Sequence, residues 1–448
     1  MRKIKLTEGN IYRSIFALSM PIMLTSFITM SYNLMDMFWL GRLSTEAVSA
    51  VGTIGLFGWL ANSVVMAPRI GVEISVAQSI GRNDHQSLRD YISSGIKSDL
   101  FISLVFMAIL YGLREPLISF YHLGDIVTKL ALDYLKIYAL AMPFTFFNPV
   151  MSGIYNGSGD SKTPFIINTI GLMVNMILDP LLIFGYFGLP EMGIKGAAWA
   201  TLIAQGIVSG LFVISGKEYI SYCKEKVSKN YLSKIYRLGI PAAGQSCLFA
   251  IFTMVMTRFV ANFGQEAVAA QKVGNQIESI TWMSATGFST ALSTFVAQNY
   301  GAKQWDRVMK GYFIGMRIIV AIGLFTSFLL YFGGESLLSI FLPGDIKGIA
   351  IGTEYLKILA LSEIFMSAEI VTNGSFNGLG KTSIPSVNGI IFNFLRIPVA
   401  YFIVKHNFGL VYIWWDITIL SILKGISVTL IFYFYYKKYI KKHIENTI

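Results

Sequence analysis

The stretch TEAVSA at residues 45–50 recurs as QEAVAA at residues 265–270, 220 positions later in the chain. Other matches keep this spacing: Pro21 with Pro241, AQ-x-x-G at 77–81 with the same pattern at 297–301, NGSG at 156–159 with NGLG at 377–380, and Pro164 with Pro385. The offset stays at 220 or 221 throughout, and such constancy indicates an internal direct repeat. The chain is therefore predicted to contain two copies of one structural unit.

The composition indicates which solvent surrounds these copies. Of the 448 residues, 54% are hydrophobic and only 14% are charged, against about 25% charged in a typical soluble domain. So few charges cannot form the polar shell that a soluble protein of this length needs. Lipid requires no such shell, and the 41 glycines suit closely packed transmembrane helices. We therefore expect an integral membrane protein.

Apolar segments of spanning length occur twelve times, since a membrane-crossing helix needs about 20 mostly apolar residues. Their approximate centres are Ser26, Val65, Phe106, Met142, Val174 and Ile203 in the first copy, and Phe252, Ala285, Gly323, Ser362, Phe392 and Leu423 in the second. Because six is even, both copies cross the membrane in the same sense and form a parallel repeat. We predict an all-α protein with one six-helix lobe at 1–218, a second at 219–448, and a Lys-rich linker at about 217–234.

Basic residues gather at both termini, in the linker and after even-numbered spans. The positive-inside rule places these segments in the cytoplasm, with the chain in the cell membrane and its basic tail near anionic lipids. The net charge of +11 does not indicate nucleic acid, because the cations lie in short segments between spans. The first apolar run, from about Ile15, is too long for a cleaved signal peptide.

Motifs of catalysis are lacking. The four histidines fall in loops or the tail, and the chain has no phosphate-binding loop, metal cluster or hydrolase motif. We therefore expect neither an enzyme nor an ATP-driven pump, and no cofactor.

Two acidic residues interrupt apolar spans of the first copy. A charged Asp at the centre of a spanning helix costs about 2.5–3.5 kcal/mol and normally faces the protein interior, as we expect for Asp36 and Asp179. Asn175 precedes Asp179 by four residues, so both lie on one helix face. Their oxygens could hold Na⁺, and the carboxylates alone could hold H⁺. The repeat positions are Met256 and Ala400, which confines the predicted site to the first lobe.

The order of short motifs resembles the multidrug and toxic compound extrusion (MATE) family over nearly the whole chain. These motifs are DMFWLG at 36–41, EAV at 46–48, AQSIG at 77–81, NGSGDSKTP at 156–164, NMILDP at 175–180 and GIKGAA at 193–198. The resemblance implies a V-shaped pair of six-helix lobes and export driven by proton or sodium entry. It also implies a cation site at Asp36, Asn175 and Asp179. Tyr138, Asn156 and Thr201 are further candidates for the polar lining.

The leading hypothesis is a secondary active multidrug exporter that antiports organic, often cationic, compounds against H⁺ or Na⁺. We expect a monomer with small organic substrates, a coupling cation and membrane lipids as partners. A second hypothesis is a flippase for lipid-linked oligosaccharides or lipids of the same superfamily. It would need cationic side chains for a pyrophosphate headgroup, and Arg258 and Arg396 are the candidates. The acidic first lobe favours the exporter.

Overall fold

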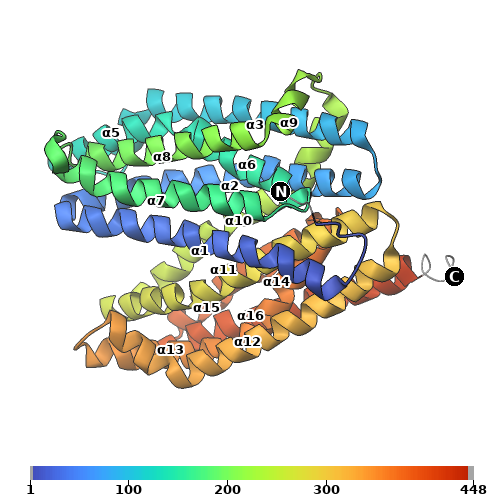
Figure 1. Ribbon diagram of the computed structural model, residues 1–448. Coiled ribbons are helices and arrows are strands. Elements are labelled where there is room, and N and C mark those ends of the chain that lie inside the picture. Colours follow the sequence, from blue (N-terminus) through green and yellow to red (C-terminus); the bar gives the residue numbers. More distant parts are fainter. Residues whose placement is uncertain (1–3, 442–448) are drawn as a thin grey trace. The chain divides into compact units, whose positions relative to one another are not determined.

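The computed structural model describes residues 4–441, and within this range the chain forms helices and no strand. The helices up to the middle of the chain are α1 Ile11–Leu43, α2 Thr45–Gly81, α3 His85–Gly112, α4 Arg114–Ser119, α5 Asp125–Leu140, α6 Met142–Gly157, α7 Lys162–Phe184, η1 Tyr186–Gly188, α8 Ile194–Ser215, α9 Lys217–Ser221 and η2 Tyr222–Lys224. The remainder are α10 Lys229–Ala261, α11 Gln265–Gly301, α12 Trp305–Phe341, α13 Ile346–Ala360, α14 Glu363–Gly378, α15 Ser383–Lys405, α16 Leu410–Tyr435 and η3 Tyr436–Ile440 (Figure 1).

Packing divides the chain into two compact units. Unit 1 consists of Leu24–Ala243 with the N-terminal residue Ile4, and unit 2 consists of Lys5–Met23 with the chain from Gly244 onward. The predicted division at 218 follows the sequence repeat, whereas the compact units follow packing. As a result, α1 and α10, the first helix of each copy, both pass from one unit into the other.

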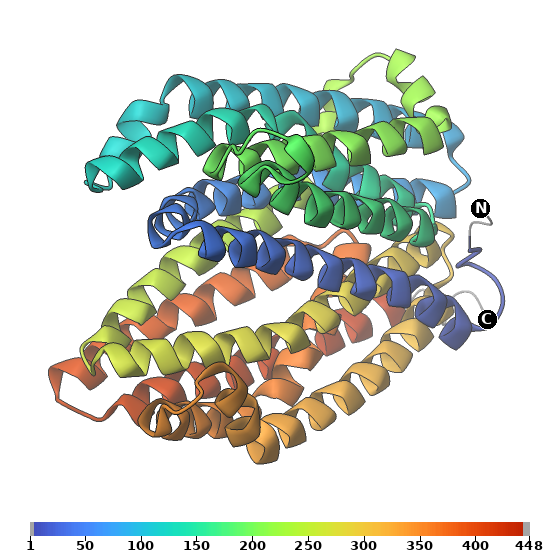
Figure 2. The ribbon, with the colours of Figure 1, turned by 60° about the vertical axis from the view of Figure 1, so that its left-hand side comes forward.

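Unit 1 is held together by helices that pack over an apolar core. Helices α7 and α8 run side by side in both views (Figure 1, Figure 2), and α2 packs against α3, α5 and α6. Phe146 and Phe212 are fully buried at the centre. The first part of α10 lies close against α2 at two glycines. A Cβ on Gly71 of α2 would collide with the backbone of Ile235, and a Cβ on Gly239 of α10 would collide with the backbone of Ala67. The linker also docks here, since Ser93 and Lys97 of α3 donate to the Glu225 carbonyl at 2.9 and 2.7 Å.

Unit 2 repeats this scheme, with α11 and α12 packed on α14 and with α15 packed on α16. Its N-terminal segment is fastened by Arg307, whose guanidinium donates to the carbonyl oxygens of Leu6, Glu8 and Gly9 at 2.9–3.1 Å. Asn299 also donates to the Leu6 carbonyl, at 3.2 Å.

Each of the twelve predicted span centres falls within a helix or at the junction of two. Span four is α5 and α6, which meet at Ala141 with a bend of 47°, and span ten is divided in the same way between α13 and α14. Within residues 4–441, nine helices are long and apolar enough to cross a membrane, and the bent α5–α6 pair is a tenth. Helix α11 and the α13–α14 pair are not among them.

Candidate functional site

The three oxygen-bearing side chains predicted to form a site come together inside unit 1. Asp36 lies on α1, and Asn175 and Asp179 lie one turn apart on α7. The Asn175 amide donates to Asp179 Oδ1 at 3.2 Å, and both residues are fully buried. The Asp36 carboxyl lies within hydrogen-bond reach of both of them. Residues separated by about 140 positions therefore share one small polar cluster, which we call the acid site.

Proline adds another oxygen beside this cluster. Pro180 lies inside α7, directly after Asp179. Because proline has no N–H, the carbonyl of Met176, one turn earlier, loses its helical partner. That carbonyl lies between Asn175 and Asp179 in the chain and is free to accept from, or coordinate, a bound species.

Several oxygens of the acid site lack a hydrogen bond of normal geometry among residues 4–441. They are Asp36 Oδ1, Asn175 Oδ1, Asp179 Oδ2, Tyr32 Oη and Thr201 Oγ1. An unsatisfied buried polar group costs about 1–3 kcal/mol, so such a concentration requires an explanation. Oxygen ligands are those that hard cations prefer, and two neighbouring carboxylates also bind protons. The donor set therefore fits either Na⁺ or H⁺.

Two tyrosines of α5 line the same site. The rings of Tyr134 and Tyr138 stack with centroids 5.7 Å apart, and both phenols lie within electrostatic reach of Asp36. Tyr138 projects to α2 at Gly58, where an added Cβ would lie 2.6 Å from its hydroxyl oxygen. Glycine at this position leaves the room that the Tyr138 side chain occupies.

The remaining two candidates have different outcomes. Thr201 of α8 reaches the acid site through Tyr32, whose hydroxyl lies near Thr201, Gln205 and both carboxylates. Asn156 lies elsewhere, at the end of α6. Asn175 is 13 residues beyond the start of α7, or about 20 Å along the helix, so Asn156 lies well away from it. Asn156 belongs to the NGSGDSKTP motif, but the structure does not bring it to Asp36, Asn175 and Asp179.

Three site residues were not predicted: Tyr32, Tyr134 and Gln205. Each lies four residues from a residue that was predicted, namely Asp36, Tyr138 and Thr201. Side chains four apart share a helix face, so this spacing was the available signal. Gln205 is held in place by Asn148 of α6, which donates to its Oε1 at 2.8 Å and accepts from Ser209 at 2.7 Å.

The repeat positions in unit 2 lack this chemistry. Met256 and Ala400 are buried together in an apolar cluster with Val260, Ile403 and Ile413. Unit 2 has its own buried charges elsewhere, and Lys424 forms an ion pair with Glu369 at 3.1 Å. Arg396 donates to Ser421 Oγ at 2.8 Å. These contacts tie α15 and α14 to α16.

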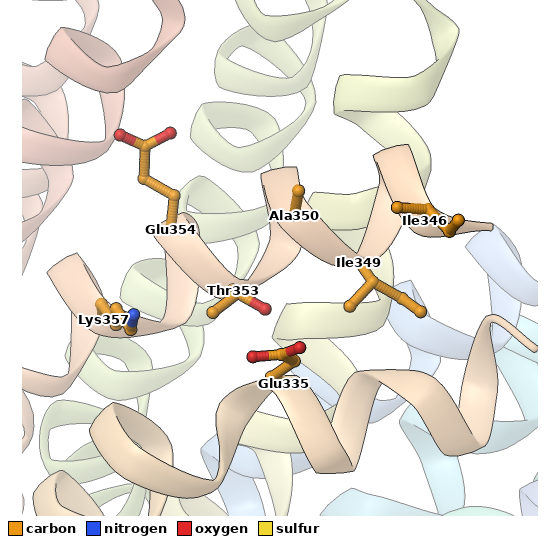
Figure 3. Close-up of a pocket in the computed structure, with 7 residues that line it drawn as sticks. All are labelled: Glu335, Ile346, Ile349, Ala350, Thr353, Glu354 and Lys357. Atoms are coloured by element: carbon orange, nitrogen blue, oxygen red, sulfur yellow. The ribbon is translucent and has the colours of Figure 1, made fainter.

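A hollow also lies between the end of α12 and α13 in unit 2 (Figure 3). In it, Ile349 and Thr353 point toward Glu335, whereas Glu354 points away. None of the predicted site residues lines this hollow.

Comparison with known proteins gives a consistent assignment. The chain matches the MatE family over residues 21–181 and 241–402, two segments that begin 220 residues apart (241 − 21), like the internal repeat. It is 29% identical over 416 residues to a probable multidrug resistance protein NorM from Thermotoga maritima, covering 90% of this chain and 88% of that protein. It is 27% identical over 412 residues to the probable multidrug resistance protein YoeA of Bacillus subtilis, covering 90% and 89%.

Solved structures have the same fold. An outward-facing multidrug resistance MATE transporter of the MOP superfamily aligns with a TM-score of 0.89, at 20% identity and over 99% of both chains. A MATE structure described as bent aligns with a TM-score of 0.90. These neighbours have twelve helices in two lobes, which confirms the predicted fold class.

Proposed function

Because this chain belongs to the MATE family of membrane transporters, we propose that it is a secondary active exporter of organic, often cationic, compounds. The bacterial relatives named as multidrug resistance proteins support this class of substrate. The observation that carries the proposal is the acid site. It holds two neighbouring carboxylates, of which Asp179 is fully buried, and several oxygens without a partner among residues 4–441, with no basic side chain among the groups that act on it.

Coupling follows from the repulsion between the two carboxylates. With both charged, Asp36 on α1 and Asp179 on α7 repel each other across a short gap of low dielectric. A bound H⁺ or Na⁺ removes that repulsion and lets α1 and α7 approach. Inward movement of one cation down the membrane potential supplies about 2.3 kcal/mol per 100 mV. A cationic substrate favoured by the charged site would be released when the coupling cation binds.

The second hypothesis, a lipid or lipid-linked oligosaccharide flippase, finds less support. A pyrophosphate headgroup needs accessible cationic side chains. Lys424 is already paired with Glu369, Arg396 donates to α16, and the acid site would repel an anion. An FAD transporter from Shewanella oneidensis is 26% identical over 346 residues, so anionic substrates belong among the compounds tested.

Transport in proteoliposomes tests both the class and the ion. Ethidium efflux would be measured with a pH gradient or a Na⁺ gradient imposed separately. We expect one gradient to drive efflux and Asp36→Asn to abolish the effect. Asp125→Asn, at the exposed start of α5, is the matched control and should retain full coupling. Undiminished coupling in the double variant Asp36→Asn, Asp179→Asn would overturn the proposal.

A further inference from the structure

Asp99 is a buried carboxyl that the proposed export mechanism does not use. It lies 14 residues after the start of α3, about 20 Å along the helix, and only 1% of its surface is exposed. Both carboxylate oxygens lack a hydrogen-bond partner among residues 4–441. No basic group of the described chain pairs with it. A carboxylate ionised in such surroundings would cost several kcal/mol, so the neutral, protonated form of Asp99 is favoured over the charged one.

The neighbours of Asp99 define what it can bind. The ionisable side chains on elements packed against α3 include Arg69 and Glu73 on α2, Tyr138 on α5, Tyr155 on α6 and Cys223 on η2. None of these lies within electrostatic reach of the Asp99 carboxyl. By contrast, Tyr236 in the first part of α10 lies within electrostatic reach of Asp99, and its buried hydroxyl lies near Ser98 and Asp99. Asp36 and Asp179 do not act on Asp99 either, so the two sets of acids are separate.

The internal repeat shows that packing alone does not require an acid here. In unit 1, a Cβ on Gly95 of α3 would collide with Val72 of α2. In unit 2, a Cβ on Gly315 of α12 would collide with Leu292 of α11. Gly315 and Leu292 each lie 220 positions after Gly95 and Val72. The α2–α3 and α11–α12 pairs therefore pack in the same register.

In that register Asp99 corresponds to Ile319 (99 + 220), which is fully buried in α12. Tyr236 corresponds to Phe16 (236 − 220), which is 59% exposed in the N-terminal segment of unit 2. The repeat therefore gives a buried counterpart for Asp99 alone. Since the same scaffold buries an apolar side chain at the position of Asp99, packing does not require an acid there.

We propose that Asp99, assisted by the Tyr236 hydroxyl, is a second proton-binding site in unit 1, separate from the acid site. A proton is the ligand because one carboxyl and one phenol offer too few oxygens for a metal ion, which takes about six or more. The proton is held while α2, α3 and the first part of α10 are packed together. It leaves when these helices separate and water reaches the carboxylate. Because α10 continues into unit 2 after Ala243, rearrangement of that helix would control the site.

Infrared spectroscopy of the full chain in lipid tests the proposal, since a protonated carboxyl absorbs separately from a carboxylate. We expect Asp99→Asn and Asp99→Ile to remove one protonated-carboxyl band that the double variant Asp36→Asn, Asp179→Asn retains. Tyr236→Phe should shift that band by removing a neighbouring hydroxyl. An unchanged band in both Asp99 variants, or its loss only in the acid-site variant, would overturn the proposal.

Thermal unfolding gives a second readout. A proton bound in the folded state makes stability fall as the pH rises. We expect this slope to be shallower in Asp99→Ile than in the wild type, with the Tm of the variant equal or higher at alkaline pH. Equal slopes would count against the site. Neither measurement requires transport, so the outcome is independent of whether the chain exports organic cations.

Discussion

At the scale of single residues, the acid site depends on which oxygens have partners. The Asn175 side-chain nitrogen donates a hydrogen bond to Asp179, whereas the Asn175 side-chain oxygen has no partner among residues 4–441 and can face a ligand. One side chain thus both orients a carboxylate and offers an oxygen of its own. The side-chain amide of Asn168, two turns earlier on α7, instead donates to the backbone carbonyl of Pro164 in the same helix. The two asparagines are therefore chemically alike but differ in what their side chains contact.

Asn175→Ala should weaken binding of the coupling cation about tenfold, because one hydrogen bond to a charged group contributes about 1.5 kcal/mol. The measurement is the Na⁺ concentration or pH that gives half-maximal thermal protection. Asn168→Ala is the control and should leave this midpoint unchanged. Equal midpoints in both variants would remove Asn175 from the site.

At the scale of the element, helix breaks and close approaches position these residues. Tyr134 and Tyr138 lie in the last two turns of α5, before the bend at Ala141, and Gly58 of α2 leaves room for the Tyr138 hydroxyl. Gly55, one turn away on the same helix, has open space around its Cα. A side chain would therefore fit at Gly55, whereas at Gly58 it would displace Tyr138.

Gly58→Ala should displace Tyr138 and reduce gradient-driven efflux several-fold, because the new Cβ would lie 2.6 Å from the tyrosine oxygen. Gly55→Ala should transport like the wild type. Both variants should unfold at temperatures near that of the wild type. If Gly58→Ala keeps its full rate, the position of the Tyr138 ring does not limit transport.

The start of α3 depends on a side-chain cap. Asp84 accepts from the Ser87 backbone N–H at 3.0 Å, and bonds from the Ser87 hydroxyl and N–H lower the pKa of Asp84. A lowered pKa means that the charged form stabilises the fold at any pH above the unfolded value. This stabilisation is lost as the pH falls through the folded value.

Asp84→Ala should therefore cost about 1 kcal/mol at neutral pH. The loss of Tm relative to the wild type should shrink below about pH 4, where the unfolded Asp becomes protonated. Asp125→Ala serves as the control, because α5 is capped by Gly124 without a side-chain bond. A Tm difference that does not vary with pH would argue against a charged cap.

At the scale of the whole molecule, one scaffold was duplicated and only one copy has acids at these positions. Asp36 and Asp179 correspond to Met256 and Ala400, which pack within an apolar cluster of unit 2. Replacing buried ionisable groups by well-packed apolar residues is often neutral or stabilising. We therefore expect that folding does not depend on the acids of unit 1.

The double variant Asp36→Met, Asp179→Ala should fold with a Tm no lower than that of the wild type, yet show no gradient-driven efflux. The reverse exchange, Met256→Asp with Ala400→Asp, should lower the Tm by placing unpaired acids in an apolar cluster. Thermal unfolding and proteoliposome efflux check both variants. Loss of folding in the first would mean that the acid site also has a structural role.

The repeat, the membrane setting, the all-helical fold and the grouping of Asp36, Asn175 and Asp179 could all be predicted from the amino-acid sequence. These properties are local or periodic: apolar length defines a span, and an acid inside a span must face the interior. Only the packed structure brings Tyr32, Tyr134 and Gln205 next to this set and places Asn156 away from it. It also shows that Asp99 has no hydrogen-bond partner within residues 4–441 and that packing divides α1 and α10. These facts depend on which faces of distant helices meet, and spacing along the chain does not specify that.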